Sequence, residues 1–138
     1  MAKCTVILPT EIEEQLSRLG DKTDSIVESV LQAGGEVVLS RVSSNLSGVL
    51  SGKSTGELEQ SLGLSPVKID SKGIHNIKIG FSEPRKGKGK SNAKVATVLE
   101  YGSSRQKARP FMKPAKSQSK NSAIAAMTEK FKSEVEKL

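Results

Sequence analysis

Apolar residues recur at helical spacing over two long stretches of the chain. One stripe comprises Ile26, Val27, Val30, Leu31, Gly34, Val37, Val38, Val42, Leu46 and Val49. Near the C-terminus, Ile124, Met127, Phe131, Val135 and Leu138 repeat at close to heptad spacing. Such stripes are typical of amphipathic helices that pack one face against a partner surface. They predict a long central helix, with Ser25 and Glu28 as a capping box, and a C-terminal helix that begins near residues 110–114.

The long stripe contains the pair Gly34 and Gly35. Each glycine costs about 1 kcal/mol relative to Ala in a helix interior. We therefore expect a bend or a close helix contact at this pair.

Two shorter helices are predicted from capping and stop signals. Thr10 and Glu13 fit a capping box ahead of a helix that Gly20 ends. Residues 94–101 form the second short helix, and Gly102 ends it.

The remaining apolar runs favour extended structure. Residues 3–8, 58–69 and 74–81 read as strands, and a turn at residues 71–73 joins the last two into an antiparallel hairpin. We expect Ile77, Ile79 and Phe81 to pack on the long helix, with Lys78 and His75 facing elsewhere. The fold class that follows is α+β: a small antiparallel sheet packed against a long helix and a C-terminal helix, in a single domain over residues 1–138.

The composition limits the kind of core, disulfide and membrane segment that the chain can form. The chain of 138 residues has three Phe, one Tyr and no Trp, so its core is expected to be aliphatic. Its one cysteine, Cys4, allows no intramolecular disulfide. No segment approaches the roughly 18 to 20 apolar residues of a membrane span, and residues 1–9 are too short for a signal peptide. We expect synthesis in a cytoplasm and no membrane partner.

The net charge of +7 is concentrated in one segment. Residues 83–120 hold eleven Lys and Arg against two Asp and Glu. The loop at 83–93 is expected to be flexible, because Gly, Lys and Ser bury little apolar area. Two interpretations remain open for it: a solvated loop, or a contact with DNA phosphate or an acidic partner through Arg85, Lys86, Lys88 and Lys90.

The same loop nearly matches a nucleotide-binding P-loop. Pro84 stands where that motif needs its first Gly, ahead of Gly89, Lys90 and Ser91. His75, the one histidine, is expected at a surface or sheet edge, and Cys4 is expected to be a small buried apolar residue. We therefore expect no enzyme activity, no cofactor and no metal.

Two blocks of residues carry a family resemblance. The first block contains Thr55, Gly56, Leu58, Ser61 and Leu62. The second contains Glu100, Tyr101, Gly102, Ala108, Arg109, Pro110, Phe111, Pro114 and Ala115. In this order and spacing the chain resembles the head-tail joining proteins of long-tailed bacteriophages, also called neck or tail-completion proteins. Ser103 is a mild departure, since the family more often has Thr there.

The resemblance implies a structural virion component at the head-tail junction that assembles as a homo-oligomeric ring around the DNA path. The implied partners are connector or stopper proteins, tail-tube or tail-terminator proteins, and DNA in the lumen. The two blocks would supply interface or fold-defining positions. In isolation, Gly56 and Gly102 can equally serve backbone turns, and Pro110 can serve a helix start.

An alternative resemblance concerns residues 3–32. They are similar to a ribbon-helix-helix DNA-binding module, with residues 3–8 as the strand and residues 9–19 and 24–32 as the helices. Ile7 departs from the polar pattern of such strands, and the basic density lies elsewhere. This alternative also leaves residues 40–138 without a role.

Overall fold

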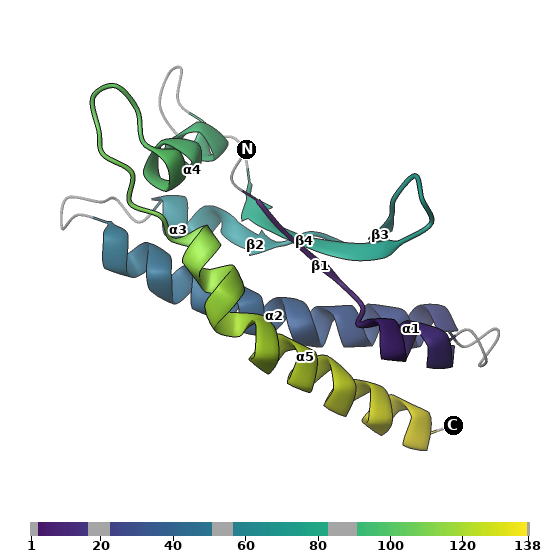
Figure 1. Cartoon of the computed structure of the whole chain (residues 1–138). Coiled ribbons are helices and arrows are strands. Elements are labelled where there is room, and N and C mark those ends of the chain that lie inside the picture. Colours follow the sequence, from purple (N-terminus) through teal and green to yellow (C-terminus); the bar gives the residue numbers. More distant parts are fainter. Residues whose placement is uncertain (1–2, 17–22, 51–56, 83–90, 138) are drawn as a thin grey trace.

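Two long helices form the base of the fold. Helix α2 (Thr23–Val49) and helix α5 (Met112–Glu136) pack together and run in opposite directions, and the sheet lies over α2 (Figure 1). The computed structural model describes residues 3–16, 23–50, 57–82 and 91–137. Within these ranges the α+β class and the two covering helices predicted from the sequence are confirmed.

The predicted stripe on α2 is its buried face. Ile26, Val27, Val30, Leu31, Val38, Val42 and Leu46 all belong to the core. Gly34 makes the expected close helix contact, because a Cβ there would lie 2.6 Å from Cγ and Sδ of Met127 on α5. The predicted start was wrong: α2 begins at Thr23, so Ser25 lies inside the first turn rather than at the cap.

Helix α5 buries Met127 and Phe131 of the predicted stripe, and Val135 packs against the core, but Ile124 does not belong to the buried face. The buried positions of α5 recur every three or four residues and are Met112, Ala115, Ser119, Ala123, Met127 and Phe131. Ile124 is 39% exposed, because it lies one residue beyond Ala123 and therefore about 100° around the helix. The small side chains of Ala115, Ser119 and Ala123 continue the buried face toward the start of the helix, and Ala123 rather than Ile124 is buried.

Strand β4 (His75–Phe81) is the centre of the sheet. Strand β1 (Cys4–Ile7) pairs with one edge of β4, while β2 (Leu62–Leu64) and β3 (Lys68–Ile69) pair with the other, and every pairing is antiparallel. The predicted hairpin is confirmed. Asp70 Oδ1 accepts hydrogen bonds from the backbone N–H groups of Lys72 and Ile74 at 2.8 and 2.9 Å, and Gly73 adopts φ 79° in the turn.

Two strand predictions were wrong. Residues 57–61 form a short helix, α3 (Glu57–Ser61), rather than the start of an extended segment. His75 lies on the same face of β4 as Ile77 and Ile79, because side chains alternate along a strand, and it is half-buried there. Ile77 and Ile79 are fully covered by the core, as predicted, and Lys78 is exposed.

Two further helices complete the described fold. Helix α1 (Thr10–Leu16) follows β1, and residues 17–20 of the predicted helix lie outside the described ranges. Helix α4 (Asn92–Tyr101) ends at Gly102, as predicted, and Ser91 Oγ caps its start by accepting from the N–H of Lys94. No helix of the described residues is long and apolar enough to cross a membrane.

Candidate functional site

The carboxylate of Glu100 sits at the start of α5. Glu100 is the penultimate residue of α4 and is only 5% exposed. Its Oε1 accepts hydrogen bonds from the N–H groups of Phe111 and Met112 at 3.2 and 2.7 Å, and its Oε2 accepts from Lys113 N–H at 3.3 Å. The first N–H groups of a helix have no partner within that helix, and Pro114 has no N–H to satisfy. One buried side chain therefore caps α5 completely from a different helix.

The connection between α4 and α5 turns back sharply at Gly102. This residue adopts φ 80°, and a Cβ on it would lie 2.8 Å from the backbone nitrogen of Ala108. Ser103 and Gln106 exchange backbone hydrogen bonds across the turn. Arg109 N–H then donates to the carbonyl of Leu99 at 2.7 Å. Any larger residue at 102 would be strained in conformation and would collide with the returning chain.

The residues after this turn bind the C-terminal half of α2. Arg109 Nη1 donates to the carbonyl of Val49, the last residue of α2, at 3.0 Å. Asn45 Nδ2 donates to the carbonyl of Phe111 at 3.1 Å. The Phe111 ring is fully buried and meets Phe81 edge to face, with ring centroids 6.1 Å apart. Asn45 was not singled out from the sequence, and nothing local marks it, since its partner lies 66 residues away.

The structure therefore brings together the core members of the second block. Glu100, Phe111 and Ala115 are buried, whereas Pro110 is exposed and Pro114 is half-buried in the first turn of α5. Tyr101 differs from its neighbour Glu100, because 65% of it is exposed. We propose that Glu100, Gly102, Arg109 and Phe111 act by defining the fold and that Tyr101 is available for contacts with other molecules.

The first block forms α3 and the start of β2. Leu58 is a core residue, and Ser61 Oγ donates to the carbonyl of Leu58 at 2.8 Å. Leu62 pairs with Phe81, which places this block beside the Phe81–Phe111 contact. Thr55 and Gly56 lie outside the described residues. The same holds for Arg85, Lys86, Lys88 and Lys90, so their proposed contact stays a prediction.

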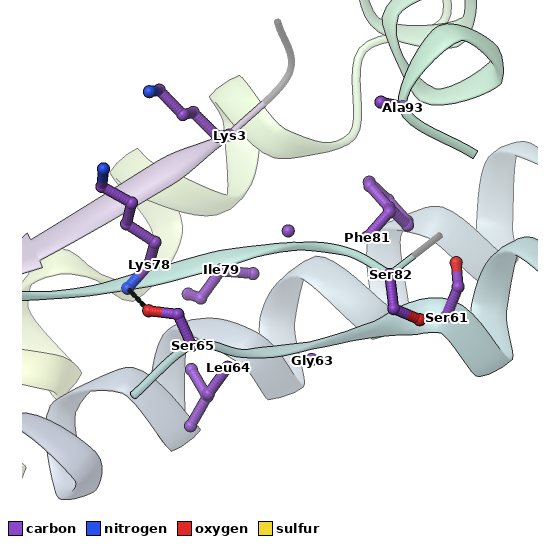
Figure 2. A pocket seen from close by; sticks show the side chains of 11 residues that line it. Lys3, Ser61, Gly63, Leu64, Ser65, Lys78, Ile79, Phe81, Ser82 and Ala93 are labelled. Atoms are coloured by element: carbon purple, nitrogen blue, oxygen red, sulfur yellow. Dashed lines mark hydrogen bonds between the residues drawn. The ribbon is translucent and has the colours of Figure 1, made fainter. Parts of the chain in front are cut away.

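A pocket of about 360 Å³ opens beside β4 and β2 (Figure 2). Lys3, just before β1, and Lys78 of β4 extend on the same side of the sheet, and Ala93 of α4 also lines the pocket. Ser65 Oγ is held by the backbone N–H of Lys78 at 2.9 Å. The described residues that line this pocket include no carboxylate, imidazole or thiol.

The other candidate reactive groups are separated from one another. Cys4 is buried in the core, as predicted, and burial raises the pKa of its thiol while the charge of Lys116 opposes that rise. His75 lines an open groove with Asp24 and Glu28 of α2. Within the described ranges, no three His, Cys, Asp or Glu side chains are grouped as metal ligands.

The alternative DNA-binding module gains no support from the described structure. Its strand, β1, pairs with β4 of the same chain. Residues 24–32, its second helix, are the first part of the 27-residue helix α2, and their apolar side chains are buried in this chain's own core.

One comparison with known proteins gave a match. The model of a protein family described as "Bacteriophage HK97-gp10, putative tail-component" matches residues 10–102. This range runs from the first residue of α1 to the glycine that ends α4. No curated protein and no solved structure matches the chain significantly.

Proposed function

Because the chain belongs to the HK97-gp10-like family of bacteriophage tail components, we propose that it is a structural virion protein that assembles as a ring at the head-tail junction. The observation that carries this proposal is the family match over residues 10–102, which includes every described strand except β1. The second block then continues beyond the match to Ala115 and includes the cap of α5.

The geometry supports a building block rather than a catalyst. Glu100, Arg109 and Phe111 of the second block join α2, α4 and α5, and Leu58 of the first block fills the core. A junction protein must hold its shape under load, and a buried carboxylate with three donors is a rigid way to fix one helix on another. We propose that the chain acts without catalytic turnover, cofactor or metal.

The proposed neighbours are a connector or stopper protein on the head side and a tail-tube or tail-terminator protein on the tail side. DNA passing through the ring is the proposed partner of Arg85, Lys86, Lys88 and Lys90. An acidic neighbouring subunit is the other proposed partner of these four side chains.

The test is to delete the gene from the phage or prophage that carries it and to examine the particles by electron microscopy. A junction protein predicts filled heads and finished tails that are not joined, and restoration of joined particles when the gene is supplied separately. Normal joined particles in the deletion strain would refute the proposed position.

A further inference from the structure

Exposed acids of the described residues are concentrated at one end of the fold and exposed cations at the other, although Lys68 and Lys132 also lie near acids at the first end. Helix α1 and the first turns of α2 lie at one end, whereas α4 and the loop that follows it lie at the other (Figure 1). At the first end, described residues 10–16 and 23–28 contain no Lys or Arg and five exposed acids: Glu11, Glu13, Glu14, Asp24 and Glu28. We call this the acidic end.

The opposite end carries the reverse charge. Among residues 91–120 the exposed charges are all positive: Lys94, Arg105, Lys107, Arg109, Lys113, Lys116 and Lys120. The one acid in this range, Glu100, is buried and bound to three backbone N–H groups. We call this the basic end, and its outermost part is the loop 103–110, which we call the return loop (Figure 1).

The acidic end is hollowed by an open groove of about 590 Å³. Asp24 and Glu28 line it from α2, and Val67, Lys68, Ile69 and His75 line it from the hairpin. Ile69 is 62% exposed, so the groove presents an aliphatic side chain together with two carboxylates. Within the described parts of the chain, no ion pair neutralises Asp24 or Glu28.

The basic end carries side chains that complement this groove. Tyr101 is 65% exposed at the base of the return loop, and Arg105 and Lys107 on that loop are exposed and form no ion pair within the described residues. An exposed aromatic ring flanked by cations fits a groove that combines an exposed aliphatic side chain with carboxylates.

We propose that the groove of one copy of this chain receives Tyr101 and the return loop of a second copy. The two surfaces lie at opposite ends of the fold, so one molecule cannot satisfy its own groove (Figure 1). Contact between two different surfaces repeats from copy to copy and closes into a ring when the rotation permits. The inference rests on the proposed ring function and names the residues through which neighbouring subunits meet.

A second copy fits better than DNA as the occupant of this contact. DNA phosphate would match Arg105 and Lys107 but would leave the carboxylates and exposed Ile69 at the other end without a partner. The second copy supplies the complement of both ends at once. Duplex DNA is therefore the competing outcome of the test.

The test reverses the charges of each surface separately. One variant carries Arg105→Glu and Lys107→Glu, and the other carries Asp24→Lys and Glu28→Lys. Sedimentation velocity over a concentration series measures self-association, and circular dichroism checks that each variant is folded. Each variant alone should associate at least about tenfold more weakly than the wild type, because attraction becomes repulsion. An equimolar mixture should regain association, since the acidic loop of one variant then meets the basic groove of the other.

The matched control reverses Lys116 and Lys120, which lie on α5 away from the return loop. It changes the net charge of the chain as much as the loop variant does and should leave association unchanged. Equal weakening in this control, or a mixture of folded variants that stays dissociated, would overturn the proposal. A wild type that binds a duplex oligonucleotide through Arg105 and Lys107 and stays monomeric would assign the basic end to DNA instead.

Failure of this contact and failure of the proposed function give different results. Immunoblotting of purified virions for this protein tests the function without reference to the contact. Protein present in virions together with a failed charge swap would remove the groove contact and keep the virion role. Protein absent from virions, together with association restored in the mixture of variants, would keep the groove contact and refute the virion role.

Discussion

Replacing Glu100 by Gln should destabilise the protein strongly although it changes so few atoms. Gln keeps one carbonyl oxygen, which can still accept from Phe111 and Met112 at the place of Oε1. Its amide nitrogen then faces the N–H of Lys113, which now donates to Oε2 at 3.3 Å. Two donors meet there, and one helical N–H loses its acceptor.

The magnitude follows from two losses. An N–H left without an acceptor in a buried site costs about 1–3 kcal/mol. Removing a negative charge from a partly buried helix N-terminus costs up to about 2 kcal/mol. We expect Glu100→Gln to lower the free energy of unfolding by about 2–4 kcal/mol and Glu100→Ala by about 3–5 kcal/mol, against a usual total of about 5–15 kcal/mol.

Urea unfolding followed by circular dichroism measures both changes. Glu59→Gln is the matched control, because among the described residues the Glu59 carboxylate accepts from the exposed hydroxyl of Ser47, at 2.8 Å. That control should stay within about 0.5 kcal/mol of the wild type. A Glu100→Gln variant as stable as the Glu59→Gln variant would refute the claim that the carboxylate caps α5.

Three further predictions address the helix contact, the buried thiol and the basic loop. Gly34→Ala should lower the free energy of unfolding by about 1–3 kcal/mol, because its Cβ would collide with Met127. Gly48→Ala, with open space around it, should raise that free energy by up to about 1 kcal/mol. If urea titrations gave the same change for both variants, the close contact of Gly34 with Met127 would be contradicted. Burial raises the pKa of the Cys4 thiol above its ordinary value of about 9. The folded state therefore favours the neutral thiol, and the free energy of unfolding falls as the pH rises above about 9. Iodoacetamide should therefore label the native thiol far more slowly than the urea-unfolded thiol, and equal rates would show that Cys4 is accessible. Serine at all four basic loop positions should leave the melting temperature unchanged yet lower the infectious titre, whereas a wild-type titre would show that Arg85, Lys86, Lys88 and Lys90 are only solvated.

The spacing of apolar residues was sufficient to predict the helices and strands whose apolar residues are large and regularly spaced. Helix α2 and strand β4 follow their patterns closely, because each buries a face of branched side chains. Helix α5 shows the limit of this reasoning. Met127 and Phe131 were predicted correctly, but Ala115, Ser119 and Ala123 carry little hydrophobic signal, and Ile124 was predicted on the buried face where Ala123 lies.

The residues of the candidate site could be recognised in the sequence as a motif, but the hydrogen bonds they make could not be predicted. Local capping rules look for an acceptor next to a helix start, whereas Glu100 lies 11 to 13 residues before its three donors. The contacts of Arg109 with Val49 and of Asn45 with Phe111 span 60 and 66 residues. Such pairings depend on how α2 and α5 pack, and no local spacing encodes them.

The proposal of a junction ring is tested most directly by cryo-electron microscopy of intact virions. We expect a ring of copies of this chain between head and tail, in which the paired helices α2 and α5 can be recognised in each subunit. Virions that lack the protein, or that hold it only in the capsid shell or at the distal tip of the tail, would contradict it.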